Sequence, residues 1–378
     1  MTGVLAGVRI VEIAGIGPGP FCAMLLADLG AEVISIERPG DTGPRPAAIV
    51  QRGKRSIVLD LKAPGAVEAV LRLLETADGL IEGMRPGVME RLGLSPQVCL
   101  ARRPALVYGR MTGWGQHGPL AQRAGHDSNY TGLAGALWFA GPAGQPPAAP
   151  TTVLGDIGGG ALYLALGLVA GILRARSDGR GQVVDAAIVD GTAHMLNLLL
   201  AMTARGAGLA RGVNAFDAAH WAGRSYRCRD GGWINLASLE PQFYAELLQR
   251  LGLDGDARFV QGQHDAALWP ALAEHLARLF AEHDRAHWCA VLDGSDACWA
   301  PVLRPDEAAE HPHLAARGTY LRVDGVLQAA PAPRFGATPS PPVAAVPRRG
   351  AHTEAVLAGL GLSPREIAGL QGPSPTAP

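Results

Sequence analysis

Short apolar runs alternate with amphipathic segments through the first half of the chain. The runs have the length of buried strands, and they cover residues 8–13, 32–36, 56–61, 79–82, 105–111 and 182–188. Helical periodicity lies between them, for example at residues 65–76 and 88–92. This alternation predicts an α/β fold with an open parallel sheet, whose ligands lie at the carboxyl ends of the strands.

The pattern changes after residue 204. Residues 205–224 have no clear periodicity, which predicts a linker. The next segments predict two hairpins and three helices, at residues 225–237, 241–251, 268–283, 285–292 and 319–328. The Pro- and Ala-rich residues 329–349 favour an extended segment before a short helix at 352–360. We therefore expect a large α/β domain (1–204), a linker (205–224), a smaller α+β domain (225–328) and a C-terminal return to the large domain (329–378).

Two polar residues precede apolar helical segments in the middle of the chain. Asp156 comes before the uncharged residues 157–173, which predict a buried helix, and His126 comes before a helix predicted at 132–139. The simplest role of this aspartate is to cap the first turn of its helix. The simplest role of the histidine is a packed or solvated position. A further helix at 191–204 carries Met195, Leu198 and Met202 on one stripe, which favours core packing.

Basic residues follow successive predicted strands. Arg38, Lys62 and Arg85 come after the second, third and fourth strands, and Arg91 follows one short helix later. Four cations at corresponding ends of a parallel sheet suit a ligand with several phosphates. Coenzyme A, which carries three, is such a ligand.

The glycine-rich turn at residues 15–20 has a superficial likeness to a dinucleotide-binding loop. Glu37 lies where a ribose-binding acid would be expected. However, Pro20 replaces the third glycine and Pro18 stiffens the turn. We therefore expect an adenine nucleotide other than a nicotinamide cofactor.

Composition narrows the class of protein further. A formal charge of −1 and a pI near 6.8 argue against a nucleic-acid or membrane-surface partner. The five cysteines are far apart, without a C-x-x-C pair or clustered histidines, which predicts reduced thiols in a cytoplasmic protein and no metal site. The uncharged run at 157–173 is close to the minimum for a membrane span, but a buried helix explains it better.

Seven sequence blocks carry a resemblance that extends over nearly the whole chain. In order they are VRIVEIAGIGPGPFCAMLLADLGAEVISIERPG, SIVLDLK, LIEGMRPGVMERLGL, LVYGRMTGWGQHGPLAQRAGHDSNY, GDIGGG, GRGQVVDAAIVDG and EPQFY. With these blocks the chain resembles the alpha-methylacyl-CoA racemases of the family III CoA-transferase superfamily. The resemblance implies an acyl-CoA substrate, no separate cofactor because coenzyme A is part of the substrate, and a homodimer of two interlocked, ring-like chains.

The resemblance also assigns catalytic roles. His126 and Asp156 match the two groups that remove and return the α-proton of the thioester, each acting as base on one enantiomer and as acid on the other. The backbone N–H of Asp127 matches the donor to the enolate oxygen. Glu240 matches a carboxylate that reaches the histidine from the partner subunit; the alternative is an ordinary glutamate at a helix N-terminus.

Further positions match contacts to coenzyme A in the racemases. They are Arg38, Leu59, Asp60, Leu61, Lys62, Gly83, Met84, Arg85, Arg91, Gly125 and Tyr130.

One segment departs from the racemase pattern. Residues 217–225 read DAAHWAGRS where the racemases have a glycine- and aromatic-bearing run that lines the acyl site. His220, Trp221 and Arg224 in this segment imply a different acyl group, a polar substituent on it, or an altered reaction.

We expect a racemase that inverts the α-carbon of a 2-methylacyl-CoA, of the 2-arylpropionyl or branched-acyl type, by two-base proton transfer through an enolate. One alternative is a CoA-transferase that uses Asp156 as a nucleophile. Another is a CoA-binding protein without turnover. His126 favours the racemase, because the transferases of the superfamily do not place a histidine there.

Overall fold

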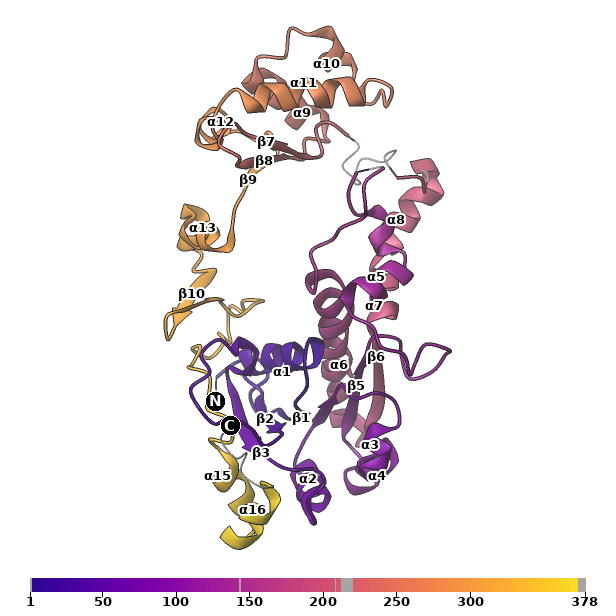
Figure 1. Cartoon of the computed structure of the whole chain (residues 1–378), viewed down its shortest axis with the longest axis vertical. Coiled ribbons are helices and arrows are strands. Elements are labelled where there is room, and N and C mark those ends of the chain that lie inside the picture. The colour runs from indigo at the N-terminus through magenta and orange to yellow at the C-terminus, as the bar shows by residue number, and fades with distance from the viewer. Residues whose placement is uncertain (1, 143, 208, 212–219, 373–378) are drawn as a thin grey trace. The chain divides into compact units, whose positions relative to one another are not determined.

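The computed structural model describes residues 2–142, 144–207, 209–211 and 220–372 (Figure 1). The chain forms two compact units. Unit 1 comprises Met1–Ala134, Pro150–Met195 and Ala315–Pro378, and unit 2 comprises Gly135–Ala149 and Leu196–Leu314. Each unit is therefore assembled from segments that are separated in the sequence.

Unit 1 is built on a parallel six-stranded sheet with the order β3-β2-β1-β4-β5-β6. The strands are β1 (Arg9–Ile13), β2 (Glu32–Glu37), β3 (Lys54–Val58), β4 (Gly79–Glu82), β5 (Val107–Thr112) and β6 (Gln182–Ala187). The predicted α/β class is confirmed. The strand order reverses direction between β1 and β4, and in open α/β sheets the ligand crevice lies at such a switch point.

Helices cover both faces of this sheet (Figure 1). One face packs against α2 (Ala66–Leu74), α3 (Val88–Arg91), α4 (Pro96–Arg102), α15 (Thr353–Ala358) and α16 (Pro364–Leu370). The other packs against α1 (Pro18–Asp28) and α6 (Leu162–Asp178). Successive strand residues point to opposite faces, so Ile10 joins one apolar cluster and Val11 the other. Burial on both faces explains why the inner strands β1, β2, β4 and β5 are rich in apolar residues, whereas the edge strand β6 is largely exposed.

The segment that carries Asp156 is a π-helix, η3 (Val153–Ala161), which continues directly into α6. Its backbone pairs five residues apart, as the N–H of Ile157 donates to the Thr152 carbonyl at 3.0 Å. Asp156 lies inside the first turn, because the helix begins three residues before it. The predicted N-cap role of Asp156 is therefore wrong.

The expectation that this helix is buried is also wrong for one of its faces. Leu162, Leu166 and Leu173 of α6 are 46%, 66% and 73% exposed. They recur at helical spacing and form an apolar stripe on the surface of unit 1.

The helix expected at 191–204 is two helices, α7 (Ile188–Met195) and α8 (Asn197–Met202), followed by η4 (Thr203–Ala207). The side chains of Met195 and Leu198 are exposed rather than part of a core. The helix expected at 132–139 is likewise divided, into α5 (Asp127–Leu133) and the short η2 (Ala136–Phe139). His126 immediately precedes α5.

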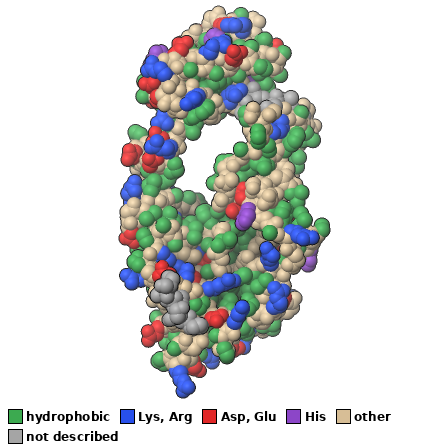
Figure 2. Space-filling view, in the orientation of Figure 1, with side chains coloured by type: hydrophobic (Ala, Val, Ile, Leu, Met, Phe, Trp, Pro, Cys, Tyr) green, Lys and Arg blue, Asp and Glu red, His purple; other side chains and the backbone are tan. Residues whose placement is uncertain are grey.

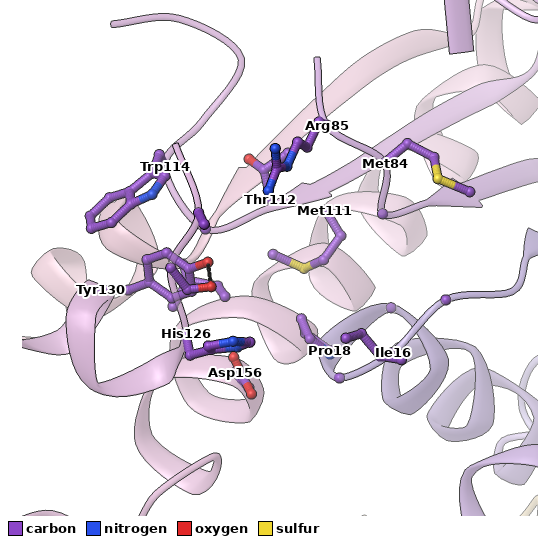
Figure 3. A pocket seen from close by; sticks show the side chains of 18 of the residues that line it. Ile16, Pro18, Met84, Arg85, Met111, Thr112, Trp114, His126, Tyr130 and Asp156 are labelled. Carbon is purple, nitrogen blue, oxygen red and sulfur yellow. Dashed lines mark hydrogen bonds between the residues drawn. The ribbon is translucent and has the colours of Figure 1, made fainter. Parts of the chain in front are cut away.

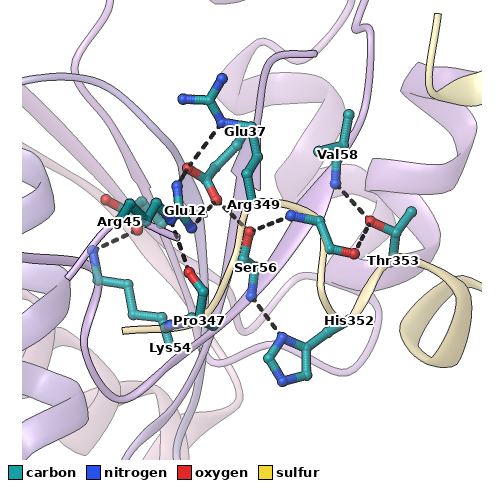
Figure 4. Close-up of polar contacts among 11 residues, drawn as sticks. Glu12, Glu37, Arg45, Lys54, Ser56, Val58, Pro347, Arg349, His352 and Thr353 are labelled. Atoms are coloured by element: carbon teal, nitrogen blue, oxygen red, sulfur yellow. Dashed lines mark hydrogen bonds and ion pairs between the residues drawn. The ribbon is translucent and has the colours of Figure 1, made fainter. Parts of the chain in front are cut away.

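The C-terminal segment of unit 1 begins with a hairpin, β10 (Tyr320–Val323) and β11 (Val326–Ala329), and then runs to the edge of the sheet. At this edge Ser56 of β3 exchanges hydrogen bonds with His352, whose N–H donates to the Ser56 carbonyl at 2.9 Å and whose Nδ1 accepts the Ser56 N–H at 3.1 Å (Figure 4). The Val58 N–H donates to Thr353 Oγ1 at 2.9 Å. The backbone of edge strand β3 is thus covered by the returning chain.

Unit 2 has an antiparallel sheet of β7 (Ser225–Arg227), β8 (Trp233–Leu236) and β9 (Trp299–Val302). Its helices include α9 (Pro241–Leu251), α10 (Ala257–Gln261), α11 (Trp269–Ala281), α12 (Arg285–Leu292) and α13 (Pro305–Glu310); α14 (Pro312–Ala316) crosses the boundary to unit 1. The core of unit 2 is aromatic, with Trp221, Phe259 and Phe280 fully buried.

Candidate active site

A pocket of about 370 Å³ lies in unit 1 at the switch point of the sheet (Figure 3). Its walls come from the turns after β1 (residues 15–20), β4 (83–86) and β5 (112–114). Parallel strands end at the same edge of a sheet, so these three turns converge there. His126 and Asp156 also line this pocket.

His126 and Asp156 reach the pocket from different elements. The backbone N–H of His126 donates to Asn129 Oδ1 at 3.0 Å, which fixes the residue at the start of α5. Asp156 projects from the first turn of η3, and Figure 3 shows the two side chains next to one another. Gly17, with a φ of 70°, brings the turn after β1 close enough that an added Cβ would lie 3.8 Å from Asp156 Oδ2.

The carboxylate of Asp127 links the two elements. It is buried, and its Oδ2 accepts the backbone N–H groups of Gly155 and Asp156, both at 2.8 Å. The first N–H groups of a helix have no partner within the helix. Asp127 satisfies two of them in η3 from the neighbouring helix α5.

The surroundings of Asp156 act on the pKa of its carboxyl in both directions. Burial raises the pKa of Asp156, the nearby Asp127 charge raises it further, and His126 opposes the shift. Tyr130 lies across the pocket, and its hydroxyl donates to the Gly125 carbonyl. Burial and the charge of Asp156 raise the pKa of the Tyr130 phenol as well.

The residues assigned to coenzyme A fall into two groups. Gly83, Met84, Arg85, Gly125 and Tyr130 line the pocket together with His126 and Asp156. Outside its lining lie Arg38, Leu59, Asp60, Leu61, Lys62 and Arg91.

The loop at residues 59–62 is held by the C-terminal segment. Leu59 is packed in the core, so only its backbone is available to a ligand. The Asp60 N–H donates to the Leu370 carbonyl at 2.8 Å, and the Asp60 carboxylate accepts the Lys62 N–H at 3.0 Å.

The four assigned cations share one feature of their surroundings. The charged groups of Arg38, Lys62, Arg85 and Arg91 are exposed, and within the described ranges they form no ion pair with a carboxylate. Figure 2 shows basic side chains distributed over the visible face of unit 1. The unpaired cations keep their charge available to an anionic ligand.

Glu37 is engaged inside the protein. Arg45 donates to both of its carboxylate oxygens, at 2.5 and 2.7 Å, and the Ser56 hydroxyl donates to it as well (Figure 4). These contacts hold the pKa of the Glu37 carboxyl below its usual value in spite of burial. The carboxylate of Glu37 is therefore committed to contacts inside the protein.

Two residues that the sequence suggested for the acyl site lie in the core of unit 2. His220 and Trp221 are 2% and 0% exposed. His220 Nδ1 accepts the Ala222 N–H at 3.0 Å, so Nε2 carries the proton and donates to the Gln263 carbonyl at 2.8 Å. Their expected place in the acyl site is wrong, because both side chains are packed inside the unit. Residues 217–219 of the same segment lie outside the described residues.

Glu240 belongs to unit 2, where it immediately precedes α9 and has an exposed side chain. Arg224, the third distinctive residue of the departing segment, lies with its guanidinium 5.8 Å from the centre of the Tyr226 ring. Neither residue is buried, in contrast to His220.

Sequence reasoning missed the apolar wall of the pocket and the role of one carboxylate. Met111 and Trp114 line the pocket, and Trp114 packs edge-on against Tyr130 with 4.7 Å between ring centroids. The signal was the Gly-Trp-Gly sequence directly after a strand. No sequence signal links the Asp127 side chain to Gly155.

Metal ligation is not indicated in the part of the chain that the structure describes, where no group of three His, Cys, Asp or Glu side chains is arranged to hold an ion. The five cysteines are free thiols.

The fold and site define an α/β protein with an imidazole–carboxyl pair at the switch point of its sheet. The chain belongs to CoA-transferase family III, whose family model matches residues 5–353. It is 41% identical over 368 residues to mouse alpha-methylacyl-CoA racemase, covering 96% of this chain and 95% of that protein. The human alpha-methylacyl-CoA racemase is 39% identical over 366 residues, with the same coverage. Among solved structures, a CaiB/BaiF family protein from Brucella suis superposes with a TM-score of 0.82 at 26% identity, covering 95% of this chain and all of the other.

Proposed function

We propose that this protein is a racemase that interconverts the two configurations at the α-carbon of a 2-methylacyl-CoA thioester. The observation that carries the proposal is the presence of two different titratable groups, His126 and Asp156, in one pocket at the switch point. The similarity to the mouse and human racemases over nearly the whole chain supports the same reaction.

The reaction requires two proton-transfer groups. One group removes the α-proton as the electrons of the C–H bond move into the enolate, and the other returns a proton to the opposite face as the thioester re-forms. An imidazole and a carboxyl can hold one shared proton, so each can be the base for one enantiomer. The raised pKa of Asp156 suits this role, because it makes the carboxyl a better base when ionised and keeps it protonated to a higher pH.

The enolate oxygen needs a donor where its charge develops. The backbone N–H of Asp127 is at the first position of α5, where helix N–H groups have no partner within the helix. We assign this N–H to the enolate oxygen. Because Asp127 follows His126 directly, the donor and one proton-transfer group are adjacent in the backbone.

Coenzyme A supplies the rest of the binding energy in this proposal. The unpaired charges of Arg38, Lys62 and Arg91 would bind its phosphates, and residues 59–62 would contact it mainly through their backbone. Met111 and Trp114 would face the acyl end of the substrate. Coenzyme A is thus a part of the substrate and not a separate cofactor.

We also propose that the protein acts as a homodimer. The exposed stripe of Leu162, Leu166 and Leu173 on α6 is an apolar surface of the kind that protein interfaces cover. By length and composition, the continuous helix Val153–Asp178 would also suffice for a membrane span. The test of the stripe must therefore distinguish a second copy of the chain from a lipid membrane. In a dimer, the exposed Glu240 would be available to orient His126 of the other subunit.

A CoA-transferase is the second candidate, because the family is named for that reaction. In a transferase Asp156 would attack the thioester carbonyl and form an anhydride, with CoA as the leaving thiolate. The α-proton would then stay in place throughout. The fate of this proton therefore distinguishes the two reactions.

The test is proton NMR of the purified protein in deuterated water. With (S)-2-methylacyl-CoA, we expect deuterium at the α-carbon together with loss of optical purity. A second sample contains acyl-CoA and a free carboxylic acid. A new thioester of the added acid, with the α-proton retained, would overturn the racemase proposal in favour of the transferase.

A further inference from the structure

The side chain of Asp127 joins the two proton-transfer elements of the pocket. His126, its neighbour in sequence, begins α5, whereas Asp156 lies in η3. The Asp127 carboxylate crosses between them to accept the N–H groups of Gly155 and Asp156, each at 2.8 Å. Asp127 is therefore linked to His126 by the peptide bond and to the first turn of η3 by two hydrogen bonds.

The fit around this carboxylate is close. A Cβ placed on Gly155 would lie 2.6 Å from Asp127 Oδ2, so a side chain at this position would displace the oxygen. Both hydrogen bonds end on that same oxygen. A buried carboxylate is stable only where such donors compensate for the loss of water.

We infer that the Asp127 carboxylate is a positioning residue, which fixes the first turn of η3 and so sets the distance between Asp156 and His126. This inference rests on the proposed racemase reaction and concerns the side chain of Asp127, whereas the donor assigned to the enolate is its backbone N–H. A π-helix has weaker intrinsic support than an α-helix and is commonly found at functional sites. External hydrogen bonds to its first turn therefore have a direct effect on where Asp156 lies.

The same carboxylate also acts on Asp156 through its charge, since the Asp127 charge contributes to the raised pKa of Asp156. His126 also acts on the pKa of Asp156, and lowers it. The charge of Asp156 in turn raises the pKa of the Tyr130 phenol. Besides these, the charged or titratable residues of the elements packed against η3 are Cys22, Asp28, Tyr108, Arg110, Tyr163, Arg174, Arg176, Asp178, Asp185, Asp190 and His194. Position and charge can be separated by the choice of substitution.

Asp127→Asn keeps an oxygen for both N–H groups and removes the charge. We expect this variant to retain most of its turnover and to shift the acid limb of its pH–rate profile to lower pH, because the pKa of Asp156 falls when a neighbouring anion is lost. Asp127→Ala removes the hydrogen bonds, and we expect kcat to fall about 100-fold, as for other displacements of a reacting group by about 1 Å. Gly155→Ala, which crowds the same oxygen, should lower kcat in the same direction.

Thr131→Val is the matched control. It removes the hydrogen bond from Thr131 Oγ1 to the Asp127 carbonyl, at 3.0 Å in the same helix, and leaves the carboxylate intact. We expect its acid limb to coincide with that of the wild type. A purely structural role of Asp127 would lower the amount of folded protein without moving the acid limb.

The measurement is deuterium exchange at the α-carbon as a function of pH, on folded protein quantified by circular dichroism. An unshifted limb in Asp127→Asn together with unchanged kcat in Gly155→Ala would overturn the inference. Absence of exchange in the wild type would instead overturn the proposed reaction, so the two failures are distinct. If Asp127→Ala does not fold, the Asn and Gly155 variants decide the outcome.

Discussion

Lys54 Nζ lies 2.8 Å from Glu12 Oε2, and both side chains are buried (Figure 4). The ammonium also donates to the Pro20 carbonyl at 3.0 Å, and Pro20 lines the pocket. The ion pair therefore connects strands β1 and β3 to the turn that approaches Asp156.

We expect Lys54→Met to lower the free energy of unfolding by about 3–5 kcal/mol, because it leaves the charge of Glu12 buried without a partner. The double variant Lys54→Met, Glu12→Leu should recover most of this loss. Urea denaturation measures both. Lys62→Met is the control, since that side chain is exposed, and a comparable loss there would contradict the explanation.

Arg38→Ala and Arg91→Ala should raise the KM for acyl-CoA by about 10- to 100-fold each, with kcat changed much less. A hydrogen bond to a charged group contributes about 1.5–3 kcal/mol, and these contacts are made equally in the ground state and the transition state. Steady-state kinetics provide the measurement. Arg102→Ala serves as the control, because Arg102 pairs with Glu68 and Glu75 on the surface. A fall in kcat at constant KM would speak against phosphate binding.

Leu166→Glu and Leu173→Glu should convert a dimer into a monomer, because each places a charge within the exposed stripe on α6. Light scattering after size-exclusion chromatography measures the mass. Val98→Glu, at an exposed position of α4, should leave the mass unchanged. If the wild type is monomeric and its α6 binds lipid vesicles, the proposal that a second copy of the chain covers the stripe is wrong.

His220 should make the stability of unit 2 depend on pH. Burial lowers the pKa of its imidazole, so the unfolded state binds a proton more readily than the folded state. The contribution of the neutral His220 to the free energy of unfolding is complete above the ordinary histidine pKa of about 6.5. It is lost as the pH falls through the lowered pKa that His220 has in the folded state. His220→Asn, which keeps an acceptor for the Ala222 N–H, should show a shallower loss of stability between about pH 7 and 5. Urea unfolding at several pH values tests this. The exposed His313→Asn is expected to follow the wild type.

The inner strands β1, β2, β4 and β5 of unit 1 were predictable because each is buried on both faces. Their apolar runs are therefore continuous, and β4 has the same bounds, Gly79–Glu82, in sequence and structure. The helix α9 also has its predicted bounds, since its buried residues recur with helical spacing along the chain. The hydrophobic pattern along the chain was enough to predict an element wherever its apolar side chains are buried within the same unit.

The failures have different physical causes. A π-helix differs from an α-helix by one residue per hydrogen-bonded turn, which composition does not reveal, so Asp156 was placed at a cap. The uncharged run at residues 157–173 looks the same in sequence whether the stripe on α6 is covered within the chain or by another molecule. The distinction between an unpaired Arg38 and the buried Arg52 depends on Asp28 and on Gln328, which is 276 residues away from Arg52.

The pairing of β3 with the C-terminal segment determines the order in which the two units can be completed during translation. Ser56 and His352 are separated by 296 residues, and translation at about 5–20 residues per second inserts them about 15–60 s apart. Throughout this interval the edge of β3 has no cover, and both segments of unit 2 are synthesised before residue 352 is added. Unit 1, which carries the pocket, is therefore the last to be completed. The segment that covers the edge of its sheet is synthesised after unit 2.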